Sequence, residues 1–361
     1  MPAPLATVTE TAPRTQLRPR GAAVVSGLAT AHPPTTYSQA EALALLGLAG
    51  DPFAERVFAR SGVRTRRLSA TPATLRQSLQ ARAGATEDWI RAMALDALAE
   101  LDFEPDAIGA LVTAGYWSLA GPTLAHRLVD ELGLRPDADK YHVTGVGCAS
   151  AVPLLRLAAQ ALRDRPGQRA LVVAAESVSG FMTATAAGDE RTKVVGCALF
   201  GDGCGAALID HGDSGRAGPA IVAAAVHQLP GSLEQVRFMV DGADSYMHLG
   251  RELPSVTEAH LPVLAHDFLA EQELEPADVD HWLVHPGGRG ILEAAQRGLG
   301  LSDEQVAHSA LVLREFGNVG TASSFFVLDA AERMLRPRPG ERGLMASIGP
   351  GVTVGLMLFE W

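Results

Sequence analysis

The chain has 361 residues, of which 47% are hydrophobic and 20% are charged, enough for one large core or two fused halves. Its formal net charge of -11 argues against a nucleic-acid-binding surface, because such surfaces are basic. No apolar run reaches the length of a membrane span, so no membrane association is expected. Cys148, Cys197 and Cys204 have the spacing of neither a zinc site nor a disulfide framework, which favours a reducing cytoplasm.

The first half of the chain begins with a tail and continues as alternating strands and helices. Residues 1–20 are rich in Pro, Thr and Ala, so we expect a disordered tail and not a signal peptide. From residue 22 on, apolar strand patterns alternate with amphipathic helix patterns. Strands are expected at 111–114, 170–175 and 205–209, and helices at 38–48, 86–98 and 123–132.

The second half repeats this pattern after a turn-rich segment at 210–219. Strands are expected at 220–225, 281–285, 343–348 and 353–359, and helices at 256–271 and 290–299. Each half ends with a Gly-rich turn that runs into an apolar strand, at 200–209 and 348–357. The pattern predicts an α/β protein built from two duplicated halves, residues 21–215 and 216–361.

Cys148 lies in the small-residue string Val143-Thr-Gly-Val-Gly-Cys-Ala-Ser-Ala151, between a strand pattern and an amphipathic helix pattern. The thiol would therefore lie at a helix N-terminus. Free N–H groups and the helix dipole lower a thiol pKa there, and a nearby imidazole lowers it further. A reactive thiolate at this position is a nucleophile that can form a thioester.

Two further polar residues follow apolar segments in Gly-rich turns. His285 stands in Trp282-Leu-Val-His-Pro-Gly-Gly288, and Asn318 stands in Phe316-Gly-Asn-Val-Gly320. Taken singly, the first is more typical of a structural turn and the second of a helix N-cap. The order Cys, His, Asn along one chain gives both a chemical interpretation.

These residues and their surroundings resemble those of the type III polyketide synthases, the chalcone-synthase-like branch of the thiolase superfamily. The resemblance extends from about residue 21 to residue 361. Five pieces carry it, in the family's order: Gly147-Cys-Ala-Ser150, Leu199-Phe-Gly-Asp-Gly203, Val284-His-Pro-Gly-Gly288, Leu313-Arg-Glu-Phe-Gly-Asn318 and Gly349-Pro-Gly351. It implies the five-layer αβαβα thiolase-like fold.

The resemblance also implies a reaction for the three residues. Cys148 would accept an acyl group from an acyl-CoA starter, which is extended by iterative decarboxylative Claisen condensation with malonyl-CoA before the polyketide cyclises. His285 would pair with the thiolate. With Asn318, it would donate hydrogen bonds to the malonyl enolate and then to the oxyanion of condensation. No metal or redox cofactor is needed for this chemistry.

The substrate-binding residues are also implied by the resemblance. Arg56 and Arg60 lie four apart on one helix face and match two family positions that contact coenzyme A, although a solvated basic face is the alternative interpretation. A third family position, usually Lys, falls near Phe53. Gly287 and Gly288 would let the pantetheine arm pass close to the backbone, or are simply turn glycines.

Three positions are expected to shape the cavity. Phe200 matches the family's gatekeeper phenylalanine, and Met247 stands near the second gatekeeper position. Gly320 replaces a common Ser, which predicts a larger pocket. Tyr116-Trp-Ser-Leu-Ala-Gly-Pro122 resembles the segment that reaches into a partner subunit, so a homodimer is implied.

Two other functions fit parts of the pattern. A ketoacyl synthase III acting with an acyl carrier protein has the same three residues and fold, but its histidine usually stands in a His-Gln-Ala-Asn context, unlike the sequence at His285. A catalytically idle thiolase-fold subunit is disfavoured by the complete set of three. The starter, the number of extensions and the mode of cyclisation stay open.

Overall fold

The computed structural model describes residues 22–115, 121–182, 191–241 and 244–361. Its main sheet has nine described strands in the order β11-β12-β13-β8-β1-β7-β6-β4-β5. In that order the strands are His281–Val284, Arg342–Gly349, Thr353–Glu360, Ala220–Gln228, Val24–Ala31, Gly203–Asp210, Arg169–Glu176, Ile108–Ala114 and Asp139–Val143.

The sheet consists of two parts with the same strand pairing. In β1-β7-β6-β4 the successive pairs are antiparallel, antiparallel and parallel. The same sequence of pairings recurs in β8-β13-β12-β11. A pairing of Val24 with Ala220 joins β1 to β8. The predicted duplication is therefore confirmed at the level of topology, with β5 as an additional edge strand beside β4.

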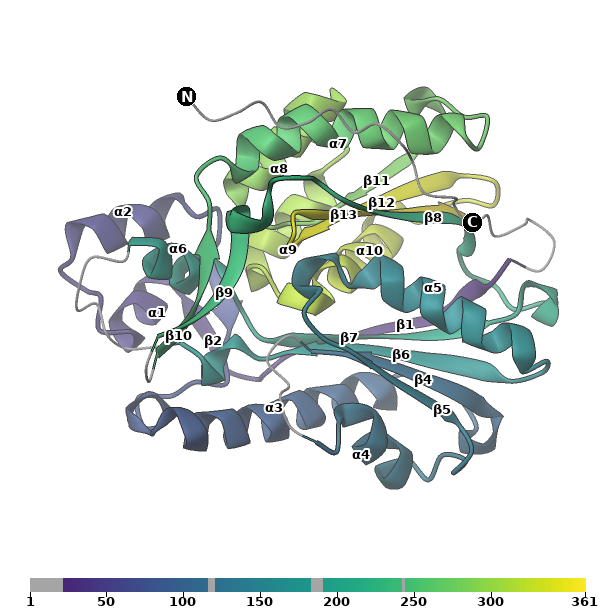
Figure 1. The fold of residues 1–361 in the computed structure, drawn as a ribbon, viewed down its shortest axis with the longest axis horizontal. Helices are drawn as coiled ribbons and strands as arrows, with labels where there is room; N and C mark the ends of the chain where they lie inside the picture. Colours follow the sequence, from purple (N-terminus) through teal and green to yellow (C-terminus); the bar gives the residue numbers. More distant parts are fainter. Residues whose placement is uncertain (1–21, 116–120, 183–190, 242–243) are drawn as a thin grey trace.

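Helices cover both outer faces of the two sheet parts and fill the space between them (Figure 1). Going from top to bottom in Figure 1, α7 and α8 form the first layer, α5 and α10 the central layer, and α3 and α4 the last layer. Their bounds in the same order are Leu253–Ala270, Arg289–Leu299, Ala151–Ala161, Ser323–Leu335, Leu79–Ala99 and Leu124–Glu131. This is the predicted five-layer αβαβα arrangement.

The central strands are covered on both faces. Every residue of β4, β6 and β7 is buried, so these strands are continuous apolar runs without alternation. The hydrophobic core falls into three clusters, of which one fills the space around α5 and α10 between the two sheet parts. Helix α3 begins seven residues before the predicted residue 86, because the Ser78 side chain caps it by accepting from the Ala81 N–H at 3.2 Å.

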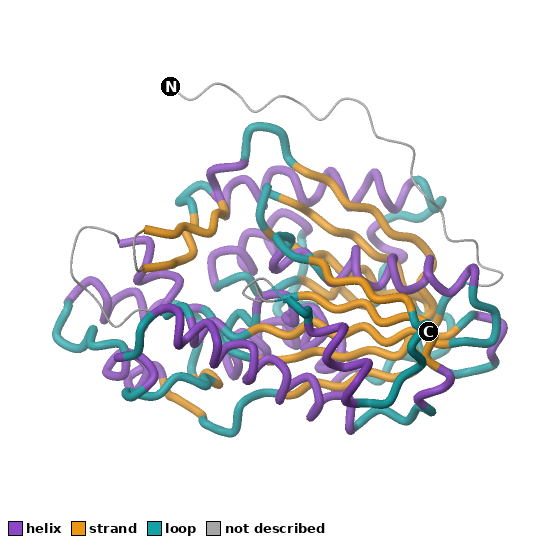
Figure 2. The backbone as a smooth tube through the Cα atoms, turned by 60° about the horizontal axis from the view of Figure 1, so that its bottom comes forward, coloured by secondary structure: helices purple, strands orange, loops and turns teal. Residues whose placement is uncertain are grey.

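A smaller group of elements lies to one side of the layers, at the left of Figure 1. It contains the β9–β10 hairpin, which Figure 2 shows apart from the main sheet. Its members are α1 (Gln39–Leu45), α2 (Pro52–Arg60), α6 (Arg191–Leu199), β2 (Thr36–Ser38), β3 (Thr65–Arg67), β9 (Val236–Asp241) and β10 (Asp244–Leu249). One further helix, α9 (Ala307–Phe316), precedes α10.

The predicted tail at 1–20 and most of the predicted dimer segment, residues 116–120, lie outside the described residues. Within the described ranges, no helix combines the length and apolarity needed to cross a bilayer.

Candidate active site

Cys148 lies where the sequence pattern places it. It occupies a short 3-10 turn, Gly147–Ala149, between β5 and the start of α5. The Ser150 hydroxyl donates to the Gly147 carbonyl at 2.6 Å and closes this turn. The Cys148 side chain is buried.

His285 follows the last residue of β11. Its backbone N–H donates to the Ala346 carbonyl at 2.8 Å, which continues the β11–β12 pairing by one residue. The side chain is 1% exposed, and its Nδ1 atom has no hydrogen-bond partner among the described residues. The imidazole therefore has a nitrogen available inside the protein.

Asn318 lies in the turn between α9 and α10, and its side-chain orientation is determined by two donors. Its Oδ1 atom accepts from the Gly320 N–H and from the Ser323 hydroxyl, both at 3.0 Å. Both side-chain atoms of this amide lie 3.6 Å from the Sγ atom of Cys148, so the thiol can donate to Oδ1 or accept from Nδ2, and Nδ2 also donates to the Gly287 carbonyl at 3.5 Å. This amide links the thiol to the loop that follows His285.

Burial dominates the electrostatics of Cys148 and His285. It raises the pKa of the Cys148 thiol to about 12, although the hydrogen bond from Asn318 acts in the opposite direction. Burial also lowers the pKa of His285 to about 3. The direction of the thiol pKa shift is therefore opposite to the lowering expected from the helix N-terminus, because burial disfavours the thiolate.

A small cavity of about 20 Å³ adjoins Cys148. The three predicted cavity residues, Phe200, Met247 and Gly320, all line it. Sequence reasoning missed the other lining residues, Gly147, Glu176, Val178 and Pro350. Glu176 carried no distinguishing signal, because it is the last residue of the apolar strand β6.

The expectation that Gly320 enlarges the pocket is wrong. Gly320 has a φ of +56°, and a Cβ atom built on it would lie 2.7 Å from Cγ of Glu176. The Glu176 side chain therefore occupies the space that a glycine would otherwise leave open. The glycine is needed for the backbone conformation and for this close approach.

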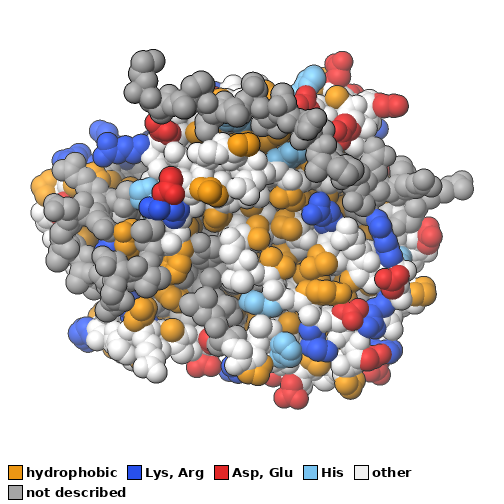
Figure 3. Space-filling model, viewed as in Figure 1, with side chains coloured by type: hydrophobic (Ala, Val, Ile, Leu, Met, Phe, Trp, Pro, Cys, Tyr) orange, Lys and Arg blue, Asp and Glu red, His pale blue; other side chains and the backbone are white. Residues whose placement is uncertain are grey.

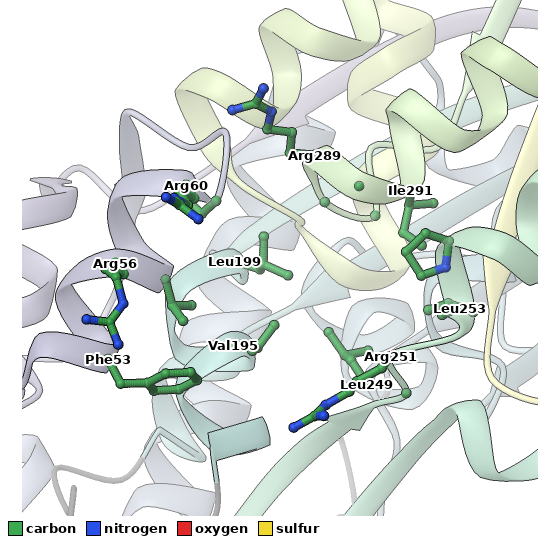
Figure 4. Close-up of a pocket in the computed structure, with 17 residues that line it drawn as sticks. Phe53, Arg56, Arg60, Val195, Leu199, Leu249, Arg251, Leu253, Arg289 and Ile291 are labelled. Carbon is green, nitrogen blue, oxygen red and sulfur yellow. The ribbon is translucent and has the colours of Figure 1, made fainter.

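A larger pocket of about 470 Å³ brings together the residues predicted to contact coenzyme A (Figure 4). Arg56 and Arg60 line it from α2, which begins at Pro52 because the Asp51 carboxylate caps it by accepting from the Phe53 N–H at 2.7 Å. Gly287 and Gly288 also line it, as does Phe53.

Two further arginines line the same pocket and were missed. Arg289 comes from the start of α8, and Arg251 from the segment after β10. In Figure 4 Arg251 lies on the other side of the pocket from Arg56, and Arg289 lies above Arg60. Neither has a neighbouring cation in the sequence, so only the tertiary structure reveals the group. By contrast, Arg66 of the basic run Arg64-Thr-Arg-Arg67 is fully buried and belongs to no surface patch.

Consecutive residues line the two pockets. Leu199 lines the larger pocket and Phe200 lines the small cavity, while Gly287 of the larger pocket accepts from Asn318 beside Cys148. A ligand in the larger pocket would therefore reach toward the thiol. Among the described residues, no group of three His, Cys, Asp or Glu side chains is placed to hold a metal ion.

Comparison with known proteins assigns the family. Residues 35–228 match the model of the FAE1/Type III polyketide synthase-like proteins, and residues 220–360 match the C-terminal domain of chalcone and stilbene synthases. The chain belongs to the type III polyketide synthase family. It is a condensing acyltransferase with a thiolase-like fold, as the sequence predicted.

Individual relatives span nearly the whole chain. The alpha-pyrone synthesis polyketide synthase-like Pks18 of Mycobacterium tuberculosis is 32% identical over 95% of this chain and 92% of its own. The 3,5-dihydroxyphenylacetyl-CoA synthase of Amycolatopsis balhimycina is 28% identical over 93% of this chain and 92% of its own. The structure of PKS-I from the brown alga Ectocarpus siliculosus superimposes with a TM-score of 0.86 at 27% identity, covering 94% of this chain and 98% of that one.

Proposed function

We propose that the enzyme loads an acyl group from an acyl-CoA onto Cys148 and extends it with malonyl-CoA, and that the product then cyclises. The observation that carries this proposal is the contact of Asn318 with Cys148, beside Gly287 of the arginine-lined pocket. An amide donor beside a nucleophilic sulfur suits a reaction in which negative charge develops on a thioester oxygen.

In the loading step, His285 takes the proton of the Cys148 thiol as Sγ attacks the carbonyl carbon of the starter thioester. The carbon–sulfur bond to coenzyme A then breaks, and the departing sulfur takes the proton from His285. Both groups are neutral at rest, because burial raises the pKa of the thiol and lowers that of the imidazole, so the proton would move as Sγ attacks and not before.

In the extension step, malonyl-CoA loses CO₂, and the electron pair of the broken carbon–carbon bond forms an enolate. The Asn318 Nδ2 group and the His285 ring donate hydrogen bonds to the enolate oxygen. The enolate carbon then attacks the Cys148 thioester. The Cys148 thiolate leaves, and the extended chain stays on coenzyme A.

Coenzyme A would occupy the larger pocket, with its phosphates near Arg56, Arg60, Arg251 and Arg289. Arginines favour phosphate because their planar fork donates two hydrogen bonds at once. The chain carries a net charge of -11, so a local cationic group is needed to attract an anionic ligand. The pantetheine arm would pass Gly287 and Gly288 toward Cys148.

We further propose a homodimer. The edge strand β5 is half-buried along its whole length and has no neighbour on its outer side among the described strands. Leu157 and Ala161 of α5 are partly buried apolar residues. Figure 3 shows hydrophobic side chains in the middle of the face on which Figure 1 places α5. A second copy would cover this face and pair the free edge.

We also propose that the halves 21–215 and 216–361 are separate units of the duplication, because each half contains the repeated strand pairing. The enzyme would work in the cytoplasm, where its three free thiols stay reduced.

One experiment tests the central proposal. The purified enzyme is incubated with malonyl-CoA and a panel of acyl-CoAs, without any carrier protein, and the products are identified by mass spectrometry. Polyketide products and CO₂ release are expected. No product from any acyl-CoA, together with product formation from a malonyl carrier protein, would contradict the proposal and favour a ketoacyl synthase III.

A further inference from the structure

Arg66 is an unusual residue for the interior of this protein. It lies in β3 and its exposed fraction is 0%. Among the described residues it forms no ion pair, although the buried Asp202 is close enough to favour its charged form. The guanidinium stacks over the Phe58 ring, 5.5 Å from the centroid. Its Nε and Nη2 atoms have no hydrogen-bond partner among the described residues. Burying a charge with so few partners is costly, so its remaining contacts need an explanation.

The guanidinium group of Arg66 binds carbonyl oxygens at the C-terminal end of α6, next to the cavity. Its Nη1 group donates to the Cys197 carbonyl and to the Phe200 carbonyl, the latter at 2.8 Å. These carbonyls lie at the C-terminus of α6, where backbone oxygens lack helical partners and a positive charge is favourable. Arg66 therefore holds the backbone of Phe200, whose side chain lines the cavity beside Cys148.

The aliphatic part of the same side chain contacts the turn that carries Asn318. A Cβ atom on Gly317 would lie 3.3 Å from Cγ and Cδ of Arg66 and 2.4 Å from the Leu199 carbonyl oxygen. The absence of a side chain at Gly317 lets the turn approach both groups. The aliphatic carbons of Arg66 thus lie against Gly317, the residue before Asn318, and its guanidinium group binds the backbone of Phe200.

Backbone hydrogen bonds tie these two turns together. The Asn318 N–H donates to the Leu199 carbonyl at 2.9 Å, and the Gly201 N–H donates to the Asn318 carbonyl at 3.0 Å. The segment 64–67, which includes β3, is hydrogen-bonded to α9 and to the turn after α6. The Arg64 N–H donates to the Arg314 carbonyl at 2.7 Å, and the Asp202 N–H donates to the Arg67 carbonyl at 2.8 Å. Arg66 lies at the centre of this junction.

We infer that Arg66 is a positioning residue that sets the place of Asn318 relative to Phe200 and Cys148. It acts through the backbone of both turns and touches no substrate. Loss of its hydrogen bonds would let the end of α6 and the Asn318 turn move apart. A displacement of about 1 Å at a catalytic group can lower the rate about 100-fold. This inference rests on the proposed role of Asn318 in malonyl-CoA decarboxylation.

The test compares Arg66→Met, Arg66→Lys and the matched control Arg64→Met with the wild type. Arg64 lies two residues away, and its side chain is 67% exposed in an ion pair with Glu315. For each protein, folding is checked by circular dichroism and thermal melting. The kcat and KM of malonyl-CoA decarboxylation and the rate of Cys148 alkylation by iodoacetamide are then measured.

Arg66→Met should lower kcat for decarboxylation roughly 10- to 100-fold, while the alkylation rate and KM change less than about twofold. Arg66→Lys should recover part of kcat, because an ammonium group can donate to one of the two carbonyls. Arg64→Met should match the wild type. A purely structural role would instead lower the melting temperature and leave kcat per labelled active site unchanged.

The outcomes separate this inference from the proposed function. If the wild type does not decarboxylate malonyl-CoA, the proposed function fails. If the wild type is active and a folded Arg66→Met protein has the wild-type kcat, only the inference is overturned. If Arg66→Met does not fold, Arg66→Lys decides: a folded Lys variant with wild-type kcat overturns the inference, and a selective loss of kcat supports it.

Discussion

The Nδ2 atom of Asn318 lies 3.6 Å from the Sγ atom of Cys148, although 170 positions separate the two residues in the chain. The amide cannot turn away without losing the two donors that hold its Oδ1 atom, the Gly320 N–H and the Ser323 hydroxyl. The thiol and the amide therefore form one preorganised pair. We expect Cys148 to act as the nucleophile and Asn318 as a hydrogen-bond donor, and the two roles can be tested separately.

We expect Cys148→Ala to abolish acyl loading and polyketide formation but to retain malonyl-CoA decarboxylation, because Asn318 and His285 still face the enolate. Asn318→Ala should lose decarboxylation as well, by roughly 100- to 1000-fold. CO₂ release and product mass are measured in parallel for the two variants. Full product formation by the Cys148→Ala protein would exclude the assigned nucleophile.

Removal of His285 should change how Cys148 alkylation depends on pH. Burial raises the pKa of the Cys148 thiol to about 12, so in His285→Ala the rate should rise only in the alkaline range. The wild type should react faster at neutral pH, because His285 would take the thiol proton in the same step in which Sγ attacks the reagent. Iodoacetamide labelling followed by mass spectrometry, from pH 5 to pH 10, checks this. Identical profiles for the two proteins would show that His285 is not the base.

Charge reversal at Arg56 and Arg60 should weaken coenzyme A binding. The double variant Arg56→Glu/Arg60→Glu should raise KM for acyl-CoA by roughly fivefold or more, because two contacts of about 0.5–1 kcal/mol each become repulsive. Turnover at saturation should change little, and added salt should weaken binding less than in the wild type. Arg289→Glu should add to the effect. Arg64→Glu, outside the pocket, is the matched control; an equal effect there would point to net charge alone.

Glu176 occupies the space beside Gly320, so substitutions at these two positions should have different effects on the cavity. Gly320→Ala should destabilise the protein by about 1–3 kcal/mol, because its Cβ would lie 2.7 Å from Cγ of Glu176 at a positive φ. Glu176→Ala should instead enlarge the cavity and permit a longer product or a bulkier starter. Met247→Phe should shift preference toward shorter starters. Melting temperatures and product masses distinguish these cases, and unchanged products from both Glu176→Ala and Met247→Phe would show that these side chains do not limit chain length.

Acid should destabilise the fold through buried neutral histidines. Burial lowers the pKa of His308 to about 4, from an ordinary value of 6.5, while its Nε2 group bonds to the Trp282 carbonyl at 2.9 Å. Below pH 6.5 the unfolded chain binds a proton that the folded protein excludes. The free energy of unfolding should therefore fall by up to about 1.4 kcal/mol per pH unit between pH 6.5 and 4, and level off below.

His308→Gln can donate to the same carbonyl and does not titrate. Its free energy of unfolding, measured by urea denaturation, should depend less steeply on pH in that range. An unchanged slope would mean that His308 does not contribute to the acid sensitivity.

The sequence by itself determined the strands, the helices and the three polar turns. Strands such as β6 are continuous apolar runs because helices cover both faces, and the turn before α5 is visible in its small residues. The order Cys148, His285, Asn318 carried the chemical interpretation. These features are local, because periodicity and turn composition act within a few residues of the chain.

Only the tertiary structure decided what occupies the space around these turns. Glu176 fills the space expected beside Gly320, and Arg251 and Arg289 join Arg56 and Arg60 across one pocket. Arg66, which the sequence places in a basic run, is buried at the junction of two turns. The pKa of Cys148 is raised because burial depends on every layer that covers the thiol. Such properties depend on contacts between distant segments, and no local pattern encodes them.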